Sequence, residues 1–230
     1  MGQETASRMA EVKHKKTSYR FSILLLAQFL LIAMFPLAGN NGLRPDIYGL
    51  FGMMVFLAGL YLVTDVRRLR IMGVVLFLPA IAGTYITFSD RVSHYAIPAG
   101  AFSIAFVAFV TAVILWTVLT SRRVTTETLF GAVVAYLFIG VVWGMAYLFV
   151  DQFAPGSLRY SNDPSRQLSW PDFTFFSFVT LTTIGYGDLV ANGGIRALVL
   201  LEGIIGAMYP AILIGKLLTA YRPEDRIVNS

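Results

Sequence analysis

Charge is scarce in this sequence and cysteine is absent. Of 230 residues, 13% are aspartate, glutamate, lysine or arginine, and 57% are hydrophobic. A typical soluble domain carries about 25% charged residues. With a mean hydropathy of +0.69, the chain cannot cover itself with polar surface in water, so the composition predicts an integral membrane protein. The lack of cysteine excludes a disulfide framework and thiolate chemistry.

The motifs of several enzyme classes are missing as well. The sequence has no His-Glu-x-x-His, no Gly-x-Ser-x-Gly and no paired aspartates within its apolar runs, so an enzyme finds no support. His14 and His94 stand alone, without the spacing of a metal site. The net charge of +5 does not indicate a nucleic-acid partner, because the basic residues lie at the ends of apolar runs, where membrane topology requires them. We also expect no organic cofactor.

Long apolar runs are what the sequence does contain. Six of them can cross roughly 30 Å of hydrocarbon, and they lie at about 21–38, 47–64, 71–88, 98–119, 128–150 and 195–219. A further apolar run at 172–183 is too short to span and predicts a re-entrant helix. The predicted fold class is therefore an all-α membrane protein with six transmembrane helices and one re-entrant helix.

The basic residues predict the orientation of these spans. With a cytoplasmic N-terminus, thirteen lysines and arginines fall inside and five fall outside. The inside set is Arg8, Lys13, Lys15, Lys16, Arg20, Arg67, Arg68, Arg70, Arg122, Arg123, Lys216, Arg222 and Arg226. Cytoplasmic loops are enriched in basic residues, so both termini are expected in the cytoplasm and the re-entrant segment is expected to enter from outside.

The re-entrant segment is followed by Thr182-Thr183-Ile184-Gly185-Tyr186-Gly187-Asp188. Together with the preceding helix from Phe176, this run resembles the pore helix and selectivity filter of potassium channels. A dehydrated K⁺ needs a cage of oxygens, and rings of backbone carbonyls supply one. Gly185 and Gly187 tolerate the positive φ that such a backbone needs. We expect K⁺ to bind at Thr183, Ile184, Gly185, Tyr186 and Gly187, with the Ile184 and Tyr186 side chains turned toward the pore helix.

The resemblance extends over about 165–219, because 201–216 also resembles the inner helix of bacterial potassium channels. It implies a homotetrameric pore made with three further identical subunits in a bacterial inner membrane. The implied organisation is a cytoplasmic segment at 1–20, a four-helix transmembrane domain at 21–119, a pore domain at 120–219 and a short cytoplasmic tail at 220–230. The first four helices match these channels in number alone.

Several residues around the filter are candidates for its support: Thr180, Thr182, Asp188 and Glu202. Glu202 lies inside a spanning helix, where an ionisable residue is costly and usually functional. Filter support through a hydrogen bond to the pore helix, with Thr180 as the candidate partner, stands beside direct ion binding and a proton-sensitive gate. Related channels often have a tryptophan that bonds the filter aspartate. Phe175 and Phe176 occupy that region here, so Asp188 is expected to be held differently.

The last apolar run contains Gly203, Gly206 and Pro210. They predict a hinge at 203–210, although small residues also serve close helix packing. Helical spacing places Gly203, Ala207, Pro210, Ile214 and Leu218 on one face. We expect this face to line the cavity, with Ile214 and Leu218 as the constriction.

The sequence supports neither a voltage sensor nor a cytoplasmic ligand-binding domain. Residues 98–119 carry no charge, so weak voltage dependence is expected. Nine residues after Tyr221 are too few for a sensing domain. We expect membrane lipids as partners and no soluble partner. The alternatives are a non-conducting or modulatory membrane subunit and a subunit of a cation transporter.

Overall fold

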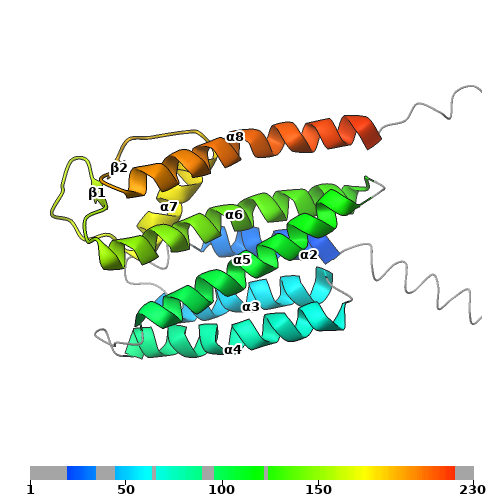
Figure 1. Ribbon diagram of the computed structural model, residues 1–230, viewed down its shortest axis with the longest axis horizontal. Helices are drawn as coiled ribbons and strands as arrows, with labels where there is room; N and C mark the ends of the chain where they lie inside the picture. The colour runs from blue at the N-terminus through cyan, green and yellow to red at the C-terminus, as the bar shows by residue number, and fades with distance from the viewer. Residues whose placement is uncertain (1–19, 35–44, 64–65, 90–95, 122–123, 221–230) are drawn as a thin grey trace, which may run out of the picture.

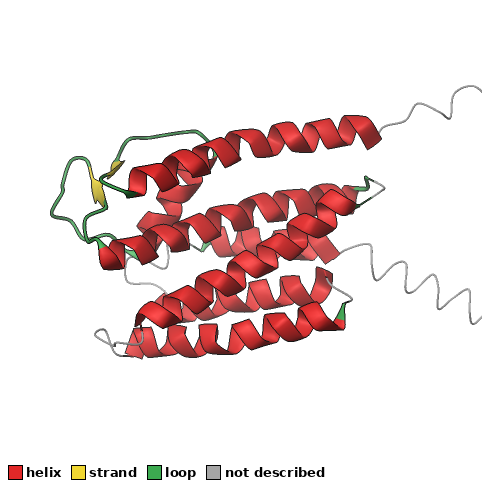
Figure 2. Cartoon of the chain, in the orientation of Figure 1, coloured by secondary structure: helices red, strands yellow, loops and turns green. Residues whose placement is uncertain are grey.

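The computed structural model describes residues 20–34, 45–63, 66–89, 96–121 and 124–220. Helices dominate it, and a small two-stranded ribbon is the exception (Figure 2). In chain order the elements are α2 (Arg20–Ala33), α3 (Pro45–Val63), α4 (Arg67–Ser89), α5 (Ala96–Thr120), α6 (Thr126–Phe153), β1 (Leu158–Tyr160), α7 (Trp170–Leu181), β2 (Leu189–Ala191) and α8 (Ile195–Ala220). The predicted segments 1–20 and 220–230 lie outside the described residues, apart from Arg20 and Ala220.

Helices α2 to α6 pack into one bundle, and α8 lies apart from α3 and α4 on the far side of α6 and α7 (Figure 1). Aromatic side chains fill the centre of the bundle. The ring centroids of Phe56 and Phe138 are 4.2 Å apart, and those of Phe77 and Phe106 are 5.4 Å apart. The short α7 lies between α6 and α8, so these three helices form a separate unit at the edge of the bundle.

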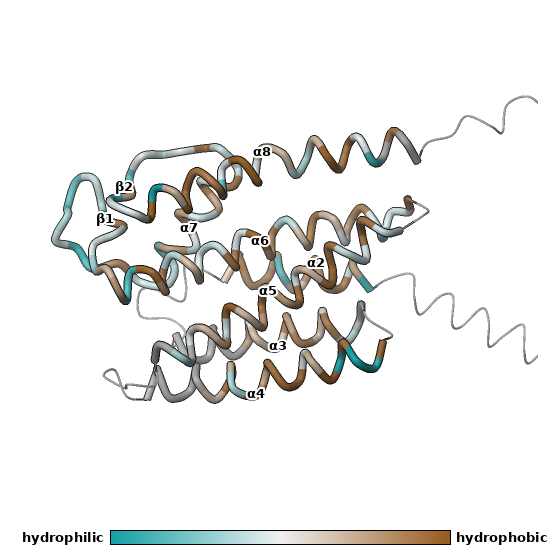
Figure 3. The backbone as a smooth tube through the Cα atoms, in the orientation of Figure 1, coloured by the Kyte–Doolittle hydropathy of each residue, from teal (hydrophilic) through white to brown (hydrophobic). Residues whose placement is uncertain are grey.

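Apolar residues dominate the middle of the molecule, and hydrophilic ones gather toward its two ends (Figure 3). Among the described residues, Gly100–Thr120, Thr126–Phe153 and Ile195–Lys216 are long and apolar enough to cross a membrane. Arg20–Ala33 and Phe51–Tyr61 are shorter apolar helices. The prediction of a helical membrane protein is thus confirmed, whereas the count of six spans stays a prediction. Helix α2 ends at Ala33, and residues 35–38 of the expected first span lie outside the described residues.

The N-terminal ends of α2 and α6 are joined by hydrogen bonds. Thr125 caps α6 by accepting from the backbone N–H of Thr128 at 3.2 Å, as a threonine before a helix commonly does. Glu127 in the first turn of α6 accepts from the backbone N–H of Phe21 at 2.9 Å and from the Ser22 hydroxyl. The carboxylate thus satisfies a free N–H at the start of α2, where negative charge is favourable, and it fixes α2 against α6.

Candidate functional site

The short helix α7 begins at a cap formed by its own first turn. Asp172 Oδ2 accepts from both the backbone N–H and the hydroxyl of Ser169, each at 2.7 Å. Pro171 occupies the first turn, where its missing N–H costs nothing. This capping box explains why α7 starts at Trp170, two residues before the predicted Asp172.

Two glycines of α6 let α7 approach closely. A Cβ at Gly140 would lie 2.8 Å from the Phe178 ring, and one at Gly144 would lie 2.9 Å from Thr174 Cα. Across the same contact, the Ser177 hydroxyl donates to the Gly140 carbonyl at 2.6 Å. Small residues at four-residue spacing allow backbones to meet in this way, so Gly140 and Gly144 set the position of α7 on α6.

The end of α7 is wedged between α6 and α8. A Cβ at Gly206 would lie 2.0 Å from the Leu181 carbonyl oxygen, and the Tyr136 hydroxyl donates to that same oxygen at 2.9 Å. The close-packing interpretation of Gly206 therefore has a direct structural basis. Gly203, by contrast, would place a Cβ with no heavy atom within 4 Å. Helix α8 runs without a break through the predicted hinge at 203–210, with Pro210 inside it.

The segment after α7 alternates its backbone conformation. Thr183, Gly185 and Gly187 have φ values of +60°, +59° and +76°. Positive φ at every second residue turns successive carbonyls toward the same side of the chain. The segment is fixed to α7 by the N–H of Ile184, which donates to the Val179 carbonyl at 2.9 Å. Positive φ costs glycine little but costs threonine about 1–2 kcal/mol, and backbone strain of this kind clusters at ligand sites.

The side chains of this segment lie on the surface of the single chain. Ile184 is 56% exposed and Tyr186 is 69% exposed. The Tyr186 ring stacks on Phe175 of α7, with centroids 6.1 Å apart and planes at 9°. The tyrosine thus lies against the re-entrant helix. The remaining exposure of both side chains leaves room for further contacts with other chains.

Strand β2 follows directly on this segment and pairs with β1, which precedes α7, to form a two-stranded ribbon. The strands are antiparallel, with Tyr160 opposite Leu189, and the N–H of Ser161 donates to the Asp188 carbonyl at 2.8 Å. Asp188 Oδ1 accepts from the N–H of Leu189 at 3.1 Å. The aspartate is thus held by backbone groups of the ribbon and of its own neighbour. Leu158 and Leu189 are buried in one cluster with Phe173 of α7, which anchors the ribbon.

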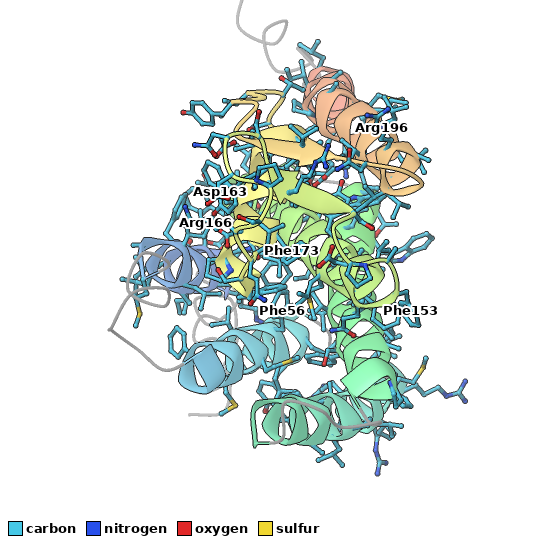
Figure 4. All side chains as sticks on the ribbon, turned by 90° about the vertical axis from the view of Figure 1, so that its left-hand side faces the viewer. Phe56, Phe153, Asp163, Arg166, Phe173 and Arg196 are labelled. Atoms are coloured by element: carbon cyan, nitrogen blue, oxygen red, sulfur yellow. The ribbon has the colours of Figure 1, made fainter. Side chains whose placement is uncertain are left out.

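Tyr160 links the ribbon to the start of α7. Its hydroxyl donates to Asp172 Oδ1 at 2.7 Å, and the Arg166 guanidinium lies 4.3 Å from its ring centroid. Burial, followed by the hydrogen bond to Asp172, raises the pKa of Tyr160 to about 12. The hydrogen bond from the Ser165 hydroxyl lowers the pKa of Asp163 in the same loop. Figure 4 views the molecule from this end and shows Asp163 and Arg166 beside the ribbon.

Glu202 is completely buried where α8 meets α6 and α7. The hydroxyls of Ser177 in α7 and Tyr147 in α6 each donate to one of its two carboxylate oxygens. The expected contact with the re-entrant helix is therefore made by Ser177 and not by Thr180, whose carbonyl accepts from Thr183 N at 3.0 Å. The carboxylate has no exposed surface and both of its oxygens accept hydroxyl hydrogen bonds, which argues against direct contact with an ion.

The remaining candidate support residue, Thr182, is bonded within its own helix end. Its hydroxyl donates to the Phe178 carbonyl at 2.6 Å, and its N–H donates to the same carbonyl at 3.0 Å. These bonds close the last turn of α7, where carbonyls otherwise lack partners. Thr182 therefore fixes the point at which the helix gives way to the alternating segment.

Helix α8 presents two stripes, whose centres are about 120° apart around its axis. The stripe that faces its own chain consists of Glu202, Gly206, Tyr209, Leu213 and Lys216. The Tyr209 hydroxyl donates to the Ala132 carbonyl at 2.7 Å, and Lys216 Nζ donates to the Val118 carbonyl. The predicted cavity face points elsewhere: Ala207, Pro210, Ile214 and Leu218 are exposed, and Gly203 is half-buried.

Several residues of this site were not predicted from the sequence. They are Tyr136, Tyr147 and Ser177, together with the β1–β2 ribbon. The Gly140-x-x-x-Gly144 spacing in α6 was the available signal for close packing against a neighbouring helix. Hydroxyl side chains within apolar helices were the signal for buried hydrogen bonds, although nothing in the sequence pairs them with Glu202.

Part of the chain matches the model of a known protein family. Residues 124–222, less than half of the chain, match the model of a family described as "Ion channel". The match covers α6, the ribbon, α7, the 182–188 segment and α8. No curated protein and no solved structure matched the chain. This part of the chain is therefore similar to an ion-channel domain, which, together with the apolar helices, supports an ion-channel function in a membrane.

Proposed function

We propose that the chain is one subunit of a potassium-selective channel in which four identical subunits surround the pore. The observation that carries the proposal is the positive φ at Thr183, Gly185 and Gly187, within a segment that stands between a re-entrant helix and a spanning helix. Four copies of such a backbone around one axis make rings of carbonyl oxygens that replace the water of a K⁺ ion.

The proposed ion sites lie along 183–187. The carbonyls of Thr183, Ile184, Gly185 and Tyr186 line the path, and the Thr183 hydroxyl adds an oxygen at the inner end. Helix α7 ends at Leu181, just before the first site. The C-terminal end of a helix carries partial negative charge, so four such ends favour a cation that waits below the filter.

Backbone polarity supports a multi-subunit pore. Residues 182–188 are not helical, and their side chains lie on the surface of the single chain. In hydrocarbon, non-helical backbone is tolerated where it is buried in protein or lines a water-filled path. Helix α8 also needs partners: 11% of its most apolar stretch is buried within the chain. Association of four chains covers both the 182–188 segment and the exposed apolar surface of α8. We assign Ile214 and Leu218 to the constriction at the inner end of the pore.

The arrangement of the helix ends supports the predicted orientation. The start of α2, the α5–α6 connection and the end of α8 gather at one end of the molecule, and the ribbon and the start of α7 lie at the other (Figure 1). Among the described residues, the basic ones assigned to the inside lie in elements at the first of these ends: Arg20 starts α2, Arg67, Arg68 and Arg70 start α4, and Lys216 is near the end of α8. We therefore place that end in the cytoplasm of a bacterial cell, with the filter opening outward.

A flux assay tests the proposal. Purified protein in liposomes should pass K⁺ in preference to Na⁺, and Gly185→Ala, at φ +59°, should abolish the flux. The matched control is Gly193→Ala, which has nearly the same φ of +58° and equally open surroundings but lies after the filter. It should keep the flux. Equal loss in both variants would mean general backbone strain, and no flux in the wild type would favour the non-conducting subunit.

A further inference from the structure

A groove opens on the face formed by α3 and α4, beside the connection between these helices. Its volume is about 590 Å³, within the range of pockets that hold small molecules. Its walls are apolar, with Leu57 from α3 and Ile71 and Val74 from α4 among them. Arg67 and Arg70 join the lining where α4 begins. One end of the groove is therefore cationic, and the rest of it is hydrocarbon.

The charged residues that line that end are the two arginines, Arg67 and Arg70. None of the described residues that line the groove is acidic. The sequence from 64 to 70 carries three arginines against the single aspartate Asp65. The Arg70 guanidinium lies 5.6 Å from the ring centroid of Tyr61, which also lines the groove. A cation held against an aromatic face keeps its charge at the rim while the ring extends the apolar wall.

The groove lies far from the proposed pore. Helices α3 and α4 occupy the side of the chain opposite α8, both in side view and in end view (Figures 1 and 4). In a tetramer assembled around α8, this face turns outward to the bilayer. The turn that carries the arginines belongs to the end assigned to the cytoplasm, and there anionic lipids attract basic side chains.

We infer that this groove is a binding site for an anionic glycerophospholipid. The phosphate lies between Arg67 and Arg70, and an acyl chain follows the apolar wall along Ile71 and Val74. A zwitterionic lipid carries its own cation next to the phosphate, so the two arginines favour a headgroup with net negative charge. The site does not involve the filter, and its test does not depend on ion flux.

The chain offers a matched pair of arginines for the test. Arg67 and Arg68 are both exposed and adjacent, but Arg67 lines the groove and Arg68 does not. Delipidated protein in neutral detergent is titrated with phosphatidylglycerol, and bound lipid is counted by native mass spectrometry. We expect Arg67→Gln to weaken the tightest binding about fivefold, the value of one basic residue near an anionic lipid, while Arg68→Gln leaves it unchanged. Equal losses in the two variants would mean non-specific surface charge and overturn the site.

Three further arms test the occupant. Val74→Trp should narrow the groove and weaken lipid binding, whereas Met72→Trp, an equally exposed position outside the lining, should not. Phosphatidylcholine should bind more weakly than phosphatidylglycerol, and affinity equal to it would overturn the charge argument. Glycerol phosphate, which lacks acyl chains, should not compete at equal concentration. Effective competition would show that the groove takes a free phosphate and not a lipid.

Discussion

Gly206→Ala tests the contact between the inner helix and the re-entrant helix most directly. The added Cβ would lie 2.0 Å from the Leu181 carbonyl oxygen and 2.8 Å and 2.9 Å from the carbonyl carbon and Cα of the same residue. Atoms in ordinary contact are about 3.5 Å apart, so α8 and the end of α7 must separate by about 1.5 Å. These are backbone atoms, and the oxygen also accepts from the Tyr136 hydroxyl, so no side-chain rotation relieves the clash.

The size of the effect follows from two opposing terms. Overpacking of this kind costs about 1–3 kcal/mol, and alanine regains about 0.5–1 kcal/mol over glycine inside a helix. The net loss is about 1–2 kcal/mol per subunit. At about 2–4 °C per kcal/mol for a chain of this size, the Tm of purified protein should fall by about 2–8 °C. Because Leu181 directly precedes the filter, the preference for K⁺ over Na⁺ in liposomes should fall as well.

Gly203→Ala is the control for that experiment. It lies one turn earlier in the same helix, gains the same helix propensity, and places its Cβ with no heavy atom of the chain within 4 Å. Its Tm should be unchanged or higher. If the two variants have the same Tm and the same ion preference, α8 does not pack on Leu181 as described. A change in open probability alone, without loss of stability, would instead support a hinge at Gly206.

Two other predictions concern side-chain hydrogen bonds of α7, from Ser177 to Glu202 and from Tyr160 to Asp172. Ser177→Ala removes a donor to the buried Glu202 and should cost about 1–3 kcal/mol of folding stability, measured as a lower Tm and a weaker preference for K⁺. Thr180→Ala should have a smaller effect on both measurements. A larger effect of Thr180→Ala would make Thr180 the partner of Glu202. The pKa of Tyr160 is about 12 in the folded chain and about 10 in the unfolded chain. The folded state therefore holds this proton more tightly, and folding stability should fall as pH rises from about 10 to 12. Tyr160→Phe should flatten this part of the Tm profile, and an unchanged slope would refute the raised pKa of Tyr160.

The periodicity of the sequence predicted one face of α8, and the assignment of that face to the pore stays a prediction. Spacings of three and four residues placed Ala207, Ile214 and Leu218 together, and these are exposed in the structure, while Tyr209 and Leu213 pack against the bundle. Such a pattern needs no knowledge of other helices, because apolar and small residues repeat with the helical period. The short re-entrant helix was also predictable, since its length excludes a span.

The partner of Glu202 was not predictable in the same way. Ser177 and Thr180 are three residues apart, so they lie within about 60° of each other around the helix axis. Which of them meets Glu202 depends on the rotation of α7, and the contacts with Gly140 and Gly144 fix that rotation. The β1–β2 ribbon escaped prediction for another reason: three residues per strand are too few to show an alternating pattern.

The contacts on α7 restrict where the inner helix can move without disturbing the filter. Helix α8 holds α7 at its middle through Glu202 and at its end through Gly206. Displacement of this upper part of α8 breaks a buried hydrogen bond or opens a packed backbone contact directly below Thr183. Pro210 has no N–H to donate to the Gly206 carbonyl, so the helix is weakened one turn further along. In the proposed channel, a gating motion that spares the filter must therefore begin after Gly206, which narrows the predicted hinge from 203–210 to 207–210, and it must release Lys216 from the Val118 carbonyl.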